Sequence, residues 1–111
     1  MADAARDEAG ELFARLSKRY VAEPAVSQGT GFGASPGLRV RGRIFAMLAG
    51  DGLVVKLPKT RVDELESSGV GARFDPGHGR VMKEWVAVPV GHGAEWEQLA
   101  AEAFDFVGRG S

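Results

Sequence analysis

The chain has 111 residues, of which 44% are hydrophobic and none is cysteine, and its formal net charge at pH 7 is −1. We expect one domain over residues 1–111 with a small hydrophobic core, and the lack of cysteine excludes disulfides, thiolate catalysis and cysteine-based zinc sites. No segment approaches the roughly 20 apolar residues of a membrane span, and the acidic N-terminus lacks the apolar run of a signal peptide, so we expect a cytoplasmic protein without a membrane partner.

The charges are distributed unevenly along the chain. Residues 24–61 carry one anion against six cations, which are Arg39, Arg41, Arg43, Lys56, Lys59 and Arg61. Residues 62–111 carry four cations against nine anions. Such asymmetry is typical of an interaction surface. It is also what results when distant segments fold beside each other and neutralise their charges.

The first predicted element is a helix over residues 4–23. Its apolar residues recur at helical spacing, and they are Ala5, Ala9, Leu12, Phe13, Leu16 and Tyr20. Pro24 ends this helix, because the residue before a proline is pushed away from helical angles. Residues 24–37 are rich in Gly and Ser and are interpreted as a loop or an irregular edge strand.

Residues 38–57 have the pattern of a strand meander with two tight hairpins. Arg41-Gly42 and the stretch AGDG at 49–52 are hairpin signals, since Gly supplies the positive φ that such turns require. If each hairpin closes on two residues, one face carries Ile44, Ala46, Leu48, Val55 and Leu57, and the other carries Phe45, Met47 and Val54 with Arg43 and Lys56. Two largely apolar faces predict a sheet that is covered, at least in part, on both sides.

The C-terminal half predicts a short helix, a strand and a last helix. The short helix spans 58–69, with Thr60 as its N-cap and Gly69 at its end, and the strand spans 81–90. Pro89 is expected at a sheet edge. The last helix spans 94–107, and its predicted buried stripe is Trp96, Leu99, Ala100, Ala103 and Val107. The fold class is therefore α+β: an antiparallel β-sheet flanked by an N-terminal helix, a short middle helix and a C-terminal helix. Both Trp85 and Trp96 are expected to be largely buried.

No pattern in the sequence predicts catalytic, metal or cofactor residues. GTGFGASPG at 29–37 lacks the spacing of a phosphate loop and is followed by a strand instead of a helix. His78 and His92 each lie between two glycines and are interpreted as turn residues, because no second ligand stands at metal-binding spacing. We expect a protein that is not an enzyme.

Four stretches of the chain, in matching order, resemble one protein family. GLRVRGRIFAMLAGDGLVVKLP at 37–58, RVDEL at 61–65, RFDPGHGRVMKEWVAV at 73–88 and WEQLAAEAFDFV at 96–107 resemble the N-terminal domain of the TfoX family, which is grouped loosely with MmcQ/YjbR-like proteins. The likeness covers about residues 28–107. It implies a compact α+β domain in which Pro76 to Gly79 form a turn, and it supplies no catalytic residues to carry over.

The resemblance implies regulation, since TfoX-like proteins are associated with competence genes and some relatives with DNA binding. Longer members have a second, C-terminal domain, whereas this chain resembles the first domain alone. Two main functions therefore stay open, and small-ligand binding is a third alternative. The first is a regulatory module that binds a protein partner. The second is a nucleic-acid-binding module that uses the six cations of residues 39–61. A homodimer is a further expectation.

Overall fold

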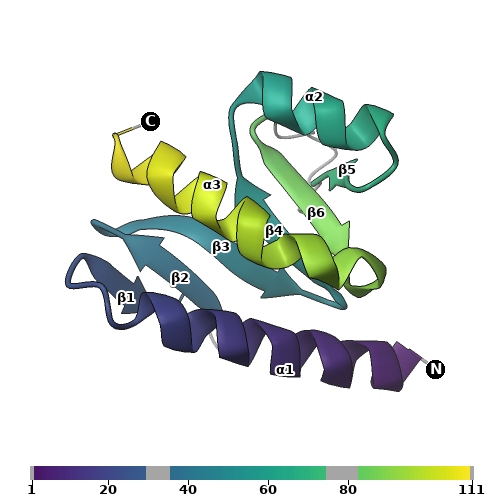
Figure 1. The fold of residues 1–111 in the computed structure, drawn as a ribbon, viewed down its shortest axis with the longest axis horizontal. Helices are drawn as coiled ribbons and strands as arrows, with labels where there is room; N and C mark the ends of the chain where they lie inside the picture. Colours follow the sequence, from purple (N-terminus) through teal and green to yellow (C-terminus); the bar gives the residue numbers. More distant parts are fainter. Residues whose placement is uncertain (1, 30–35, 75–82, 111) are drawn as a thin grey trace.

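The computed structural model of the chain describes residues 2–29, 36–74 and 83–110. Within them, three α-helices pack on a six-stranded antiparallel sheet, which confirms the predicted α+β class (Figure 1). The helices are α1 (Ala2–Tyr20), α2 (Lys59–Ser67) and α3 (Trp96–Gly108), and the 3-10 helix η1 (Val90–Glu95) leads into α3. The strands are β1 (Val26–Gln28), β2 (Gly37–Val40), β3 (Arg43–Ala49), β4 (Gly52–Lys56), β5 (Ala72–Arg73) and β6 (Trp85–Pro89).

The strand order across the sheet is β1-β2-β3-β4-β6-β5. Both predicted hairpins close on two residues, as the pairs Val40 with Arg43 and Ala49 with Gly52 demonstrate. In the β2–β3 turn, Arg41 and Gly42 have φ values of 54° and 82°, and in the β3–β4 turn Gly50 has a φ of 61°. These left-handed conformations match the twist of the flanking strands.

A β-bulge in the β2–β3 ladder changes which side chains of β3 face the core. Leu38 pairs with Ala46, but Arg39 pairs with Ile44, so Phe45 is an extra residue on β3. The prediction assigned Phe45 to the face of Met47 and Ile44 to the face of Ala46. It is wrong for Phe45 and for Ile44. Phe45 is fully buried in the core, whereas Ile44 lies with Arg39 on the opposite face and is only partly buried.

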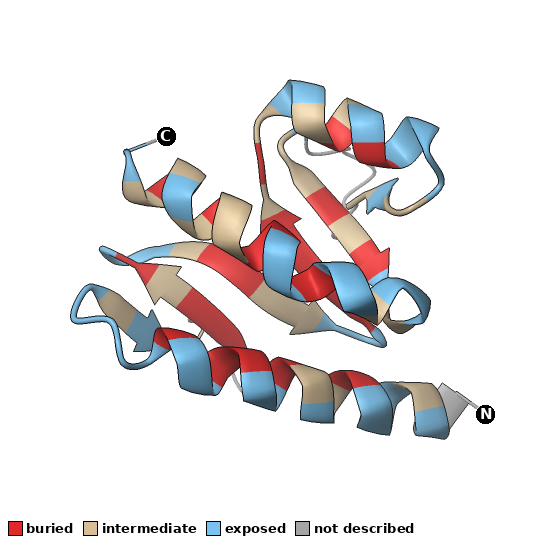
Figure 2. Ribbon diagram, in the orientation of Figure 1, coloured by how far each residue is buried: buried red, intermediate tan, exposed pale blue. Residues whose placement is uncertain are grey.

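All three helices lie on one face of the sheet. One core cluster joins apolar side chains of α1, α2 and α3 to Leu38, Val55 and Val86, which the strand register places side by side. The predicted stripe of α3 is confirmed, because the five residues named for it are its buried residues. Figure 2 shows this burial on the sides of α1 and α3 that face the strands. None of the described helices is long and apolar enough to span a membrane.

Several local predictions need correction. Thr60 lies inside α2, whose N-cap is Pro58 without a side-chain hydrogen bond, while Gly69 follows the helix end with the expected positive φ of 79°. Trp85 pairs with Lys56 on the face away from the helices and is only partly buried. β5 and η1 were not predicted. β5 is only two residues long, and η1 has no apolar periodicity, so neither leaves a clear pattern in the sequence.

Candidate functional site

The six cations predicted as one patch are divided among three parts of the molecule. Arg41 and Arg43 belong to the β2–β3 hairpin, and Lys59 and Arg61 belong to α2. Figure 1 shows this hairpin and the start of α2 at separate corners of the fold. Arg39 and Lys56 lie on the sheet face away from the helices, where both are partly buried. The buried Nε atom of Arg39 has no hydrogen-bond partner among the residues that the structure describes.

Two of these cations are neutralised by carboxylates. The Nζ of Lys59 lies 2.9 Å from Oδ2 of Asp63, and the guanidinium of Arg61 donates to both carboxylate oxygens of Glu102, at 2.8 and 3.2 Å. The hydrogen bond to Glu102 raises the pKa of Arg61. Cations paired with carboxylates are less available to phosphates. The six residues therefore do not form one basic patch.

The histidines and the glycine-rich stretch offer no assembled site in the described part of the chain. His78 and residues 30–35 of GTGFGASPG lie outside the described residues. His92 is exposed in η1, with its Nδ1 atom 3.9 Å from a carboxylate oxygen of Glu95. Among the described residues, no group of three His, Asp or Glu side chains could hold a metal ion.

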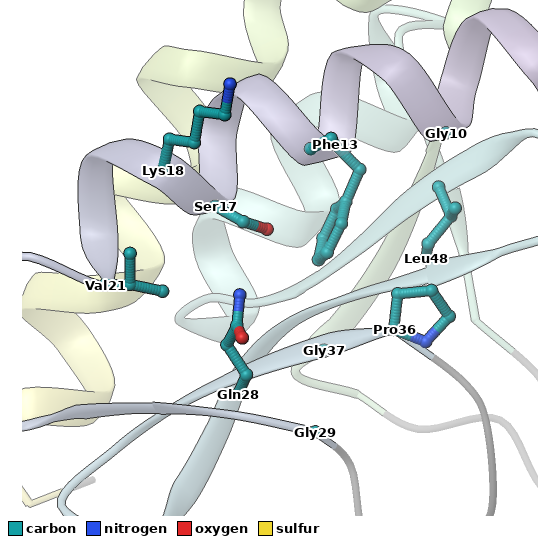
Figure 3. A pocket seen from close by; sticks show the side chains of 11 residues that line it. Gly10, Phe13, Ser17, Lys18, Val21, Gln28, Gly29, Pro36, Gly37 and Leu48 are labelled. Atoms are coloured by element: carbon teal, nitrogen blue, oxygen red, sulfur yellow. The ribbon is translucent and has the colours of Figure 1, made fainter.

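A groove of about 500 Å³ lies between α1 and the first three strands (Figure 3). We call it the α1–β1 groove. Its lining residues are Gly10, Phe13, Ala14, Ser17, Lys18, Val21, Gln28, Gly29, Pro36, Gly37 and Leu48. The α1 wall runs from Gly10 to Lys18, about 12 Å along the helix, and Val21 extends it beyond the helix end. The volume is within the usual range for ligand sites, which are mainly apolar with a few placed polar groups.

Two polar side chains, one buried and one exposed, line this groove. Ser17 is a buried polar residue, 8% exposed, and its hydroxyl points into the cavity (Figure 3). Gln28 points toward it from β1 because Gln28 pairs with Leu38 and therefore shares the helix-covered face of the sheet. Within the described part of the chain, neither side chain has a hydrogen-bond partner. Because both side chains open onto the groove and bond no described residue, they are available to hydrogen-bond an incoming group.

Gly10 leaves one end of the groove open. A Cβ atom built at Gly10 would have nothing within 4 Å, so internal packing does not require a glycine at this position of α1. A glycine inside a helix costs about 1 kcal/mol relative to alanine. At the other end, Val21 is a large apolar residue that is 45% exposed. A glycine that internal packing does not require and an exposed apolar side chain are both typical of a surface that binds a ligand or partner.

Periodicity did not reveal this groove. It depends on the antiparallel pairing of β1 with β2 beneath α1. For residues 24–37 the sequence left a loop and an irregular edge strand open. The available signals were Gly10 and Ser17 on an otherwise apolar stripe of the helix. Each is unremarkable alone, and only the packing of α1 against β1 to β3 brings them beside Gln28.

A smaller cavity of about 360 Å³ lies on the other side of α1. It is lined by Leu12, Arg15, Leu16, Arg19, Trp96 and Glu97. Arg19 and Glu97 form an ion pair within this lining, so two of its three charged side chains already have partners.

No protein-family model, curated protein or solved structure matches this chain. The resemblance to the TfoX N-terminal domain therefore stays a prediction, and the function of the groove is inferred from its own geometry.

Proposed function

We propose that this protein is a non-enzymatic binding module that takes a short extended segment of a protein partner in the α1–β1 groove. The observation that carries the proposal is an elongated, largely apolar groove onto which the Ser17 hydroxyl opens without a hydrogen-bond partner among the described residues. Its role is regulatory and cytoplasmic, of the kind that the resemblance to TfoX-like proteins implies.

The shape of the groove favours a peptide over a compact small molecule. Its wall on α1 is about 12 Å long, which corresponds to about four residues of extended chain. Phe13, Pro36 and Leu48 offer an apolar surface for a partner side chain. Such grooves bind segments by anchoring one apolar residue while polar groups fix the register.

The chemistry of the lining favours binding over catalysis. A serine acts as a nucleophile only beside a general base. The described residues that line the groove include no His, Asp or Glu, so Ser17 has no base among them. The same lining has one cation, Lys18, which is fewer than the several phosphate contacts that nucleic-acid binding uses.

Selection from a library of short random peptides, followed by a groove-filling variant, tests this function. Gly10→Leu places a side chain in the groove without meeting any atom within 4 Å of its Cβ, and it replaces a poor helix former with a good one. We expect the selected peptides to bind this variant at least about tenfold more weakly, a loss of about 1.4 kcal/mol. Thermal unfolding should be unchanged or occur at a higher temperature.

Ala4→Leu is the matched control, since Ala4 is an exposed residue of the same helix outside the groove. It should leave peptide affinity unchanged. Peptides that bind Gly10→Leu as tightly as the unmodified protein would place the binding surface elsewhere and overturn the proposal. A library from which no peptide is enriched would also count against it.

A further inference from the structure

We infer that the partner segment carries an apolar residue and an acidic residue two positions apart in an extended chain. This inference rests on the proposed function, because it names the chemistry of the segment that the α1–β1 groove selects.

The groove has an apolar part and a polar part that follow each other along α1. Phe13 on α1, Leu48 on β3 and Pro36 before β2 form the apolar part, beside the space left by Gly10. Ser17 and Gln28 form the polar part, one helical turn further along α1. An occupant that satisfies both parts has an apolar group followed by a hydrogen-bonding group.

The polar part of the groove favours a carboxylate. The Ser17 hydroxyl and the Gln28 amide both donate hydrogen bonds, and bonds to a charged acceptor are about twice as strong as neutral ones. Lys18 is the one charged residue in the described lining, so no anion there opposes a negative ligand. Its ammonium lies at the rim, turned outward in Figure 3, and its flexible four-carbon side chain can bring it to a carboxylate above Ser17.

The spacing follows from the helix. Phe13 and Ser17 are four residues apart, which is one turn and about 6 Å along the axis of α1. Residues two apart in an extended chain are separated by about 6.6 Å and point to the same side. An apolar side chain against Phe13 therefore places the acidic side chain at Ser17.

The test compares selected peptides in pairs that differ only in the acidic residue, as Asp against Asn or Glu against Gln. We expect the amide version to bind about tenfold more weakly, the effect of losing a charge-assisted hydrogen bond. Ser17→Ala should remove most of this difference in affinity. In a double-mutant cycle, the free-energy effects of two changes are not additive when the two groups interact. This variant should fold normally, since the hydroxyl has no partner among the described residues and alanine is the better helix former.

Lys18→Gln should reduce the salt dependence of peptide binding, whereas Arg15→Gln, which changes an exposed cation of α1 outside the groove, should not. Acid and amide peptides of equal affinity, with binding still blocked by Gly10→Leu, would overturn this inference and leave the proposed function standing. Selected peptides that lack an apolar and an acidic residue two positions apart would also overturn this inference and leave the proposed function standing. If Gly10→Leu has no effect on binding either, the proposed function fails first.

Discussion

At the residue scale, the two tryptophans, Trp85 and Trp96, differ in burial and in the face of the sheet on which they lie. Trp96 is 1% exposed, and its indole N–H donates to the carbonyl of Val88 at 3.1 Å, which links α3 to β6. Trp85 lies on the opposite face of the sheet and is partly buried. Only Trp96 therefore combines a large buried apolar surface with a buried hydrogen bond.

Trp96 is expected to be a major determinant of stability. Trp96→Ala should lower the free energy of unfolding by about 3–5 kcal/mol through the cavity that it leaves. Trp96→Phe should cost about 1 kcal/mol, because it removes the hydrogen bond from the indole N–H to the Val88 carbonyl. Urea denaturation measures both changes. Trp85→Phe is the control, and a cost for Trp96→Phe no larger than that of the control would contradict this account.

At the element scale, an ion pair joins the middle helix to the last one. Arg61 on α2 binds Glu102 on α3 in a bidentate arrangement, and Gln98 adds a hydrogen bond at 3.1 Å. Burial raises the pKa of Glu102, but the hydrogen bonds from Arg61 and Gln98 and the charge of Arg61 outweigh it and lower this pKa below its usual value of 4.5. The carboxylate is therefore favoured in the folded protein.

Acid should weaken this connection between helices. Because the pKa of Glu102 is lower in the folded protein than in the unfolded chain, its stabilisation is present above pH 4.5 and is lost as the pH falls below that value. Glu102→Gln should therefore lose less stability than the unmodified protein between about pH 5 and about pH 3 in urea titrations. Glu8→Gln, on an exposed part of α1, should follow the unmodified protein. Parallel pH profiles for all three proteins would refute the role of Glu102.

At the scale of the whole molecule, one helical layer covers one sheet face, and α3 is its central member. α3 contacts β2, β3 and β4, and its five buried residues belong to the single core cluster. The expected homodimer stays a prediction, as does the identity of the partner.

Removal of residues 94–111 should unfold the domain, because it exposes the apolar face of the central strands to water. Far-UV circular dichroism during heating should then show no cooperative transition. Removal of residues 109–111 alone should leave the transition in place, since it retains every buried residue of α3 and loses only an exposed ion pair between Arg109 and Asp105. A cooperative transition in the longer truncation would show that the sheet folds without this cover.

The sequence by itself determined the local elements of this protein. The buried stripe of α3, the two-residue hairpins and the end of α2 at Gly69 depend on neighbours within a few residues, so their patterns are visible in the chain. The fold class followed from the order of these elements.

Tertiary structure decided the face of Phe45, the burial of Trp85, the division of the six cations and the α1–β1 groove. A one-residue bulge reverses the side-chain alternation of a strand without changing its apolar content, so sequence alternation assigned Phe45 and Ile44 to the wrong faces. The pairing of Arg61 with Glu102 joins residues far apart in the chain, and only the packing of α1 on the sheet places Ser17 and Gln28 in one groove. Such contacts depend on register and helix packing, which local periodicity does not encode.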